Sequence, residues 1–302
     1  MGTKINIWLQ AFRLRTLPLA LSSTLVGSFL AYSFSGFRIG VFIFAILTTL
    51  FLQILSNLAN DYGDAVKGSD NPDRIGPERV TQSGKVSHQA IRRMIVFFVV
   101  LSLLAGSVLI FVGLNQFPVK TILVFFAIGF SAIYASVKYT VGRNPYGYVG
   151  LGDLFVYLYF GLIGVCGTFF LHTGFFDPWI LLPASSIGLF SSGVLNLNNL
   201  RDVDNDAENG KRTLVVRIGV KAAKVYHLVI VVVGIVLTVI YTLIFFKSPV
   251  QLLFMATIPF LYYDIRTVML NTVPVDLNGE LKKLALTTFA FSVTFSAGLI
   301  LQ

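Results

Sequence analysis

The sequence has little charge, a single cysteine and no low-complexity region or linker. Only 12% of its 302 residues are charged, about half of the roughly 25% that is typical of a soluble domain. Together with 55% hydrophobic residues and a mean hydropathy of +0.79, this shortage of charge excludes an ordinary soluble protein. Because Cys166 lies alone inside an apolar stretch, a disulfide framework and a cysteine metal site are excluded as well.

Long apolar runs fill most of the chain instead. A helix that crosses a bilayer needs about 20 mostly apolar residues. Nine such segments are predicted, at about 17–36, 40–60, 93–113, 119–138, 149–171, 178–199, 223–246, 250–268 and 283–302. The runs are too long, and alternate too little, for the strands of a membrane β-barrel. The sequence therefore predicts an all-α polytopic membrane protein whose single transmembrane domain covers residues 1–302.

The net charge of +9 is divided unevenly between the two ends of the predicted spans. Of 23 Lys and Arg residues, 20 fall in the N-terminal leader or in loops on its side, and the other three are Arg38, Lys120 and Lys247. By the positive-inside rule, the N-terminus and the long loops are cytoplasmic. The basic balance thus indicates topology and attraction to anionic membrane lipid, with no role for nucleic acid.

Acidic residues gather at the cytoplasmic ends of two spans. The first cluster is NDYGDAVKGSDNPDR, from Asn60 to Arg74, and the second is NLNNLRDVDNDAENGKR, from Asn196 to Arg212. Each follows directly on an apolar span and is introduced by asparagines. Residues three or four apart share a helix face. Two rows of oxygen ligands are therefore predicted: Asn57, Asn60, Asp61 and Asp64 in the first, and Asn198, Asp202 and Asp206 in the second.

Several carboxylates this close to hydrocarbon are costly and repel one another, so a cation is expected between them. Hard oxygen ligands suit Mg²⁺, which typically binds through a few carboxylates together with substrate phosphates. The predicted metal ligands are Asn60, Asp61, Asp64, Asn198, Asp202 and Asp206, and the four aspartates among them are the predicted catalytic residues.

Basic residues follow both acidic clusters. Carboxylates, Mg²⁺ and Arg or Lys side chains together can clamp a diphosphate. The residues predicted to contact phosphate are Arg74, Arg79, Lys138 and Lys211, with Tyr134 one turn before Lys138 as a further candidate. Glycines would let the first loop fold closely around such a ligand: Gly63, Gly68, Gly76 and Gly84.

Other interpretations of these patterns are weaker. Acidic loop residues are usually solvated surface, but here the spacing is helical and the motif occurs twice. A calcium-binding EF-hand would need glycine and glutamate where the chain has Ala207 and Thr213. A transporter should carry charged residues at the middle of its spans, and a lipid-binding scaffold would not need duplicated ligand spacing. Gly161, Gly164 and Gly167 could line a pocket, but close helix packing is the favoured interpretation.

The motifs NDYGDAVKGSD and DVDND, at the ends of spans 2 and 6, resemble the two aspartate-rich motifs of the UbiA superfamily of intramembrane prenyltransferases. RLRTLPLALSSTLVG, RIGPERVTQSG and LNLNNLRDVDNDAENGKRTLVVRIG are similar to the branch that prenylates 1,4-dihydroxy-2-naphthoate in menaquinone biosynthesis. The usual third aspartate of the first motif is replaced by Gly68, with acid following at Asp70. This form is similar to the naphthoate branch and leaves the role of Asp70 open.

The resemblance implies nine helices around a central cavity, with the active site on the cytoplasmic side of the cell inner membrane. It implies Mg²⁺-dependent transfer of a polyprenyl chain from its diphosphate to the naphthoate, with loss of CO₂ and diphosphate, to give demethylmenaquinol. The anionic naphthoate should meet a cation, for which Arg15 is a weak candidate. Sister enzymes that use 4-hydroxybenzoate, homogentisate or a haem precursor remain the nearest alternative.

Overall fold

The computed structural model describes residues 2–71, 74–77 and 79–302, so Pro72, Asp73 and Glu78 of the quoted motifs lie outside it. In these ranges the chain is helical and forms no strand. The α-helices are α1 (Gly2–Phe12), α2 (Leu17–Ser33), α3 (Ile39–Lys67), α4 (His88–Leu114), α5 (Val119–Lys138), α6 (Gly152–Val156), α7 (Thr168–Thr173), α8 (Leu181–Arg201), α9 (Val203–Glu208), α10 (Leu214–Ile244), α11 (Ile258–Leu270) and α12 (Leu277–Ile300).

Segments of 3₁₀-helix and of π-helix complete several spans. The 3₁₀ segments are η1 (Leu14–Thr16), η2 (Tyr146–Val149), η4 (Pro178–Ile180), η5 (Pro249–Thr257) and η6 (Pro274–Asp276). A π-helix, η3 (Tyr157–Gly167), joins α6 to α7 within the fifth span. Nine segments of the described chain are long and apolar enough to cross a membrane, which confirms the predicted all-α, nine-span fold of a multi-pass membrane protein.

Two spans extend beyond their predicted limits toward the acidic loops. Helix α3 continues past residue 60 to Lys67 and ends at Gly68, whose φ of 77° is the left-handed conformation that glycine adopts readily. The first acidic cluster therefore begins on a helix. Helix α10 starts at Leu214 rather than near residue 223, with the Thr213 side chain accepting from the Val216 amide and a break in the helix at Gly219.

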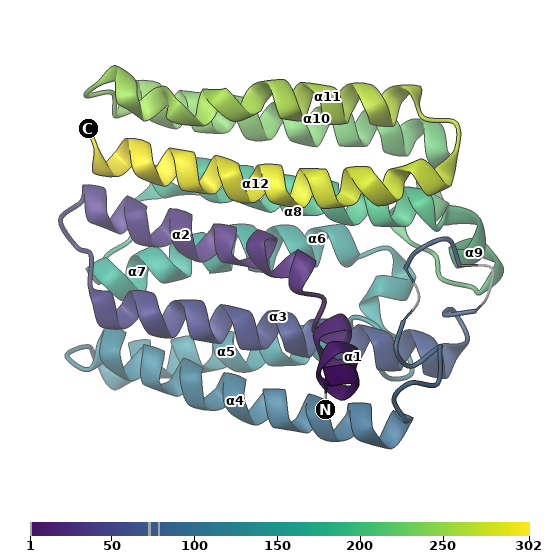
Figure 1. Cartoon of the computed structure of the whole chain (residues 1–302). Helices are drawn as coiled ribbons and strands as arrows, with labels where there is room; N and C mark the ends of the chain where they lie inside the picture. The colour runs from purple at the N-terminus through teal and green to yellow at the C-terminus, as the bar shows by residue number, and fades with distance from the viewer. Residues whose placement is uncertain (1, 72–73, 78) are drawn as a thin grey trace.

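The spans run side by side, and both acidic loops lie at the same end of the bundle, on the right of Figure 1. The C-terminus lies at the opposite end. Helix α1 lies on the outside of the bundle, against α3, and is seen almost end-on. The chain turns from α1 into α2 at Arg13, which has a φ of 51°. That conformation is uncommon for a residue other than glycine.

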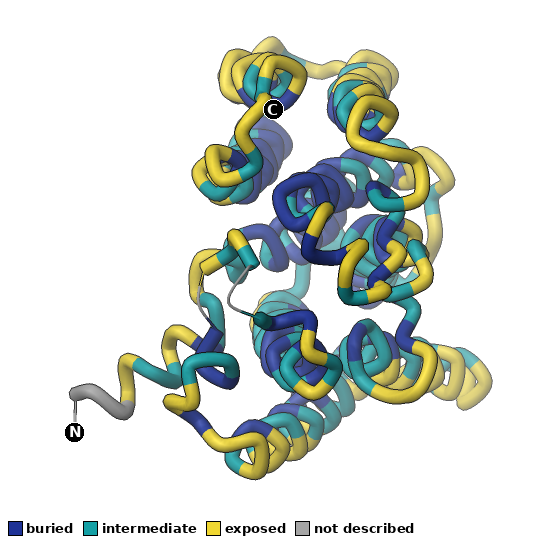
Figure 2. Tube along the Cα trace, turned by 90° about the vertical axis from the view of Figure 1, so that its right-hand side faces the viewer, coloured by how far each residue is buried: buried dark blue, intermediate teal, exposed yellow. Residues whose placement is uncertain are grey.

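Apolar side chains fill the interior of the bundle and also lie on its outer faces. The largest core includes Phe169, Phe190 and Phe291, each of which is at most 1% exposed, from α7, α8 and α12. Large apolar residues are also exposed on outer faces, for example Phe111 at 70% and Phe260 at 64%. Seen from the acidic end, buried segments occupy the centre and exposed ones the periphery (Figure 2). Such a surface suits contact with lipid chains.

Candidate active site

The Arg79 side chain contacts several residues of the first acidic motif. The end of α3 places Asp61 and Asp64 inward, where they are 2% and 1% exposed. The Arg79 guanidinium donates to Asp64 Oδ2 at 2.9 Å and to Asn60 Oδ1 at 2.8 Å. It also lies 3.0 Å from Asp70 Oδ2. Asp70, whose role the sequence left open, therefore belongs to the same cluster.

Tyr148, from η2, adds a second support to the first motif. Its hydroxyl donates to Asp64 Oδ1 at 2.8 Å and lies 2.7 Å from Ser69 Oγ. The Lys211 ammonium lies 5.6 Å from the centre of the Tyr148 ring and 3.8 Å from Asp64 Oδ2. Lys211 also lies 3.3 Å from Asp206 Oδ1, so it contacts carboxylates of both motifs.

The second motif follows a bend at the end of α8. Asp202 separates α8 from α9, yet its amide still donates to the Asn198 carbonyl, and the Asp206 amide donates to the Asp202 carbonyl. The predicted row therefore stays together, although it is not one straight helix. Arg201 binds Asp202 with two donors, Nε to Oδ1 at 2.9 Å and Nη2 to Oδ2 at 2.5 Å. Its Nη2 also donates to Asn198 Oδ1 at 2.8 Å.

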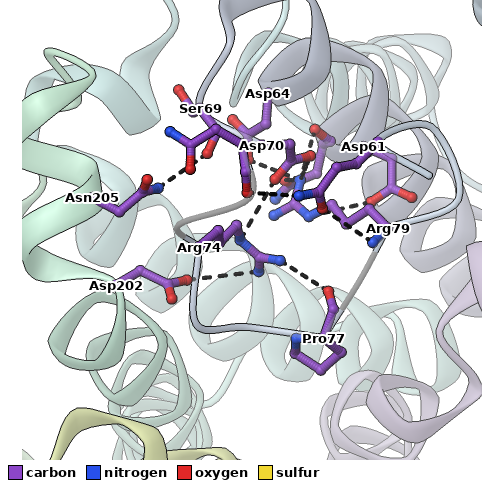
Figure 3. A network of polar contacts seen from close by, with 12 residues as sticks. Asp61, Asp64, Ser69, Asp70, Arg74, Pro77, Arg79, Asp202 and Asn205 are labelled. Atoms are coloured by element: carbon purple, nitrogen blue, oxygen red, sulfur yellow. Dashed lines mark hydrogen bonds and ion pairs between the residues drawn. The ribbon is translucent and has the colours of Figure 1, made fainter. Parts of the chain in front are cut away.

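Three contacts join the two motifs into one site, and Figure 3 shows two of them, those made by Arg74 and by Asn205. Arg74 lies 3.5 Å from Asp70 Oδ1 and 3.6 Å from Asp202 Oδ2. Asn205 donates to the Ser69 carbonyl at 3.0 Å. The third contact is the Lys211 ammonium described above. Segments more than a hundred residues apart thus share a single network of charge at the mouth of the bundle.

Gly76 lies where this network meets the backbone of the first loop. A Cβ added at Gly76 would collide with the guanidinium of Arg74 and come within 2.7 Å of Arg201 Nη2. The backbone of the loop therefore passes directly against two cationic side chains. A side chain at this position would have to displace the ends of these two arginine side chains, which glycine avoids.

The carboxylates of the site differ in their affinity for protons. Burial raises the pKa of Asp70 to about 6, against the opposing effect of Arg79. Burial also raises the pKa of Asp206 to about 6, against the charge of Lys211. Asp202 is the opposite case: burial raises its pKa, but the hydrogen bonds and charge of Arg201, together with the charges of Arg74 and Lys211, outweigh burial and lower the pKa of Asp202. Asp202 is therefore the more firmly ionised carboxylate of the second motif.

The donor set fits a hard divalent cation. Asp206 Oδ2 and both carboxylate oxygens of Asp70 are buried and accept no hydrogen bond, and the Asp70 oxygens are held only by ion pairs with Arg74 and Arg79. In the described residues, no three Asp, Glu, His or Cys side chains already converge as a cage. Mg²⁺ does not require one, since it usually keeps several waters and uses one or two carboxylates together with phosphate oxygens.

Four predicted residues make no hydrogen bond or ion pair with the carboxylates of this network. Lys138 has no such partner among the described residues, and neither has Arg15, which nevertheless lies within electrostatic reach of Arg13, Arg79 and Arg201. Tyr134 is 65% exposed. The Asn57 amide donates to the Phe12 carbonyl at 2.9 Å and to Thr16 Oγ1 at 3.1 Å, so it ties α3 to the N-terminal segment.

Other residues of the network were not predicted from the sequence. Arg13 forms an ion pair with Asp61, although the leader arginines were interpreted as topology determinants. Arg201 could have been found, because it stands beside Asp202 and three residues after Asn198, on a shared helix face. Tyr148 and Asn205 gave no such signal, since their partners are 84 and 136 residues away.

This nine-span bundle, with two carboxylate motifs joined at one end, has known relatives. The chain belongs to the UbiA prenyltransferase family, which residues 20–274 match. A 1,4-dihydroxy-2-naphthoate octaprenyltransferase of Haemophilus influenzae is 46% identical over 232 residues, covering 76% of this chain and 75% of the relative. The Escherichia coli enzyme of the same description is also 46% identical, covering 74% and 72%. The Mycobacterium tuberculosis enzyme is 34% identical, covering 70% of each chain.

Solved structures share the fold. An apo UbiA homologue from Aeropyrum pernix K1 has a TM-score of 0.70 and 16% identity, covering 96% of this chain and 98% of that one. An Archaeoglobus fulgidus homologue bound to GPP and Mg²⁺ has a TM-score of 0.60 and 14% identity, covering 96% and 99%. The resemblance to the UbiA superfamily that the motifs predicted is therefore confirmed.

Proposed function

We propose that this chain transfers a polyprenyl group from polyprenyl diphosphate to 1,4-dihydroxy-2-naphthoate. Carbon dioxide and diphosphate are lost, and demethylmenaquinol is formed in menaquinone biosynthesis. The observation that carries the chemistry is the network in which Arg74 and Lys211 each contact both acidic motifs. The choice of acceptor is supported by 46% identity to two naphthoate octaprenyltransferases over about three quarters of the chain.

The diphosphate would lie between the two motifs. Bound Mg²⁺ would neutralise the negative charge that grows on the diphosphate as it departs. The residues proposed to hold the metal, directly or through water, are Asn60, Asp61, Asp64, Asp70, Asn198, Asp202 and Asp206. Arg74, Arg79 and Lys211 are preorganised donors around the same point, and such donors stabilise charge where it develops.

When polyprenyl diphosphate binds, the arginines and Lys211 would release carboxylates and bind phosphate oxygens. They now neutralise buried carboxylates, for example in the Arg79–Asp64 pair at 2.9 Å. Phosphate oxygens offer the same geometry to a guanidinium as carboxylates do. Lys138 and Arg15 remain proposed contacts for diphosphate and for the acceptor carboxylate, although neither lies in the network that is described.

The membrane supplies the environment that the reaction needs. An allylic cation must meet the electron-rich ring before water does, and a site inside an apolar bundle excludes water. Membrane lipid would also deliver the isoprenoid tail. We place the N-terminus and the site on the cytoplasmic side of the inner membrane, supported by the excess of Lys and Arg in the loops at that end. We treat residues 1–302 as one domain.

The test compares two acceptors in membranes that contain the protein. Polyprenyl diphosphate and Mg²⁺ are supplied with carboxyl-labelled 1,4-dihydroxy-2-naphthoate or with 4-hydroxybenzoate, and labelled CO₂ and prenylated product are measured. We expect CO₂ release and product with the naphthoate, abolished by Asp61→Ala and by Asp202→Ala. Transfer to 4-hydroxybenzoate instead would retain the site but assign the chain to another branch. Transfer to neither acceptor would contradict the proposal.

A further inference from the structure

The last span begins beside the candidate active site. Helix α12 ends at the far end of the bundle, so its first turn lies at the acidic end (Figure 1). Asn278 is the second residue of this helix and is half-buried. Its side chain bonds to Arg201 of α8 and to Ile75 of the first loop, which joins α3 to α4. The start of α12 therefore contacts both of the segments that carry the acidic motifs.

The two hydrogen bonds of Asn278 use opposite ends of its amide. Arg201 Nη1 donates to Asn278 Oδ1 at 3.1 Å, and Asn278 Nδ2 donates to the Ile75 carbonyl at 3.3 Å. A guanidinium can only donate and a carbonyl can only accept, so a single orientation of the amide satisfies both partners. Asn278 is therefore a bridge that requires one donor and one acceptor on the same short side chain.

Arg201 depends on this bridge because it is buried. Its side chain belongs to a residue that is only 3% exposed. Asp202 and Asn198 accept from Nε and Nη2, and Asn278 accepts from Nη1. The guanidinium is planar and rigid, so a partner at Nη1 also fixes the direction of the other donors. Through Arg201, the bridge helps to orient two residues that are proposed to hold the metal.

The bond to Ile75 holds the first loop where it crosses the second motif. Arg74, the residue before Ile75, lies 3.6 Å from Asp202 Oδ2. A Cβ on Gly76, the residue after Ile75, would come within 2.7 Å of Arg201 Nη2. The backbone of the loop therefore lies directly on the second motif at this point, and the bond from α12 fixes it there.

We propose that Asn278 is a positioning residue of the diphosphate site. It ties the first loop to Arg201 and so sets the spacing between the two acidic motifs, where diphosphate and Mg²⁺ would lie. The identity of this ligand rests on the proposed function. Asn278 acts through its two partners rather than by contact with the ligand.

Two variants of similar shape separate the two bonds. Asn278→Leu removes both of them. Asn278→Asp keeps an oxygen for Arg201 but loses the donor to the Ile75 carbonyl. Asp276→Asn is the matched control, because Asp276 precedes the same helix, is exposed, and makes no capping hydrogen bond with its side chain.

Calorimetric titration of the purified protein with pyrophosphate and Mg²⁺ measures the site without turnover. We expect Asn278→Leu to weaken pyrophosphate binding by about five- to tenfold, because a buried donor of Arg201 loses its partner. Asp276→Asn should stay within about twofold of the wild-type protein. Unchanged affinity in Asn278→Leu would overturn the inference.

Limited digestion with trypsin tests the bond to the first loop. Both Asn278 variants should raise cleavage between Lys67 and Lys85 by about threefold or more, relative to cleavage after Arg143, which is exposed in the loop after α5. A parallel rise at both places would mean that the variants loosen the whole fold. Unchanged cleavage would mean that Asn278 does not hold the loop. Either result would overturn the inference.

These two readouts separate the inference from the proposed function. If the wild-type protein transfers no prenyl group, but Asn278→Leu weakens pyrophosphate binding and opens the loop, the proposed function fails and the role of Asn278 stands. If transfer occurs and Asn278→Leu leaves kcat/KM for polyprenyl diphosphate unchanged, the proposed function stands and the inference fails.

Discussion

At the scale of single residues, Arg79 is the side chain on which the first motif depends. It is 6% exposed and contacts three carboxylates, those of Asp61, Asp64 and Asp70. Burial disfavours its charge, but the surrounding carboxylates outweigh burial and raise the pKa of Arg79 above its usual value. A guanidinium suits this position because its donors point in several fixed directions.

Replacing Arg79 should leave the negative charge of the buried carboxylates around it without a partner. Arg79→Gln leaves buried carboxylates without a partner, which costs about 3–5 kcal/mol of stability when a buried pair is broken. Chemical unfolding in detergent measures the change. Arg143→Gln is the control, because Arg143 is exposed, and surface substitutions usually stay within about 0.5 kcal/mol.

The effect of Mg²⁺ on the stability of Arg79→Gln tests whether the carboxylates around Arg79 are metal ligands. If the freed carboxylates bind the metal, excess Mg²⁺ should restore more stability to Arg79→Gln than it adds to the wild-type protein. Equal stabilisation of both proteins would contradict the assignment of these carboxylates as metal ligands.

Some residues of the site could be predicted from the sequence and others could not. The aspartates follow from residue type and helical spacing, which are local properties. Arg13 pairs with a carboxylate 48 residues away, and Asn205 binds a carbonyl 136 residues away. The same holds for His227, whose Nε2 lies 2.8 Å from Asp264 Oδ2 and ties α10 to α11. Such pairs depend on how the helices meet, which no local pattern encodes.

At the scale of elements, the end of α3 is positioned by its contact with the segment that follows α5. A Cβ added at Gly63, between Asp61 and Asp64, would lie 2.7 Å from Thr140 Cβ. The Thr140 hydroxyl also donates to the Ala59 carbonyl at 3.0 Å. The helix and the loop therefore touch through backbone atoms, next to the carboxylates that the site uses.

The close contact between Gly63 and Thr140 should leave no room for a methyl group on residue 63. Gly63→Ala is expected to lower stability by about 1–3 kcal/mol through overpacking and to weaken pyrophosphate binding. Gly279→Ala is a suitable control, since its Cβ position on α12 is open. An open glycine in a helix gains up to about 1 kcal/mol as alanine. Unfolding midpoints measure the stability of both variants, and titrations measure their affinity for pyrophosphate. If Gly63→Ala changes neither quantity, the loop can move away from α3 at little cost and the prediction is wrong.

Element boundaries near the site were the least predictable part of the fold. Hydropathy placed the end of the second span at residue 60, whereas α3 continues to Lys67. The continuation is polar and is held by Arg79 and Tyr148, so apolar composition could not reveal it. Likewise, the bend at Asp202 divides a row that spacing alone placed on one helix.

At the scale of the whole molecule, the number of spans and the placement of both acidic loops at one end of the bundle followed from length and hydropathy. Nine spans were expected, and nine candidate spans are found in the described chain. The sequence could not show which spans pack together. In particular, close helix packing was the favoured interpretation for both Gly161 and Gly167. Gly161 does lie against Gly188 of α8, whereas Gly167 lines an apolar groove together with Phe125 of α5.

The central claim is that the two motifs, far apart in the chain, form one site for diphosphate and Mg²⁺. Asp64 and Asp206 both lie beside Lys211, at 3.8 and 3.3 Å. A double-mutant cycle of Asp64→Asn and Asp206→Asn, read by calorimetric titration of pyrophosphate with Mg²⁺, tests the claim directly. One shared site predicts non-additive losses, with a coupling of about 0.5–3 kcal/mol. Losses that add would mean that the motifs bind separately and would contradict the account.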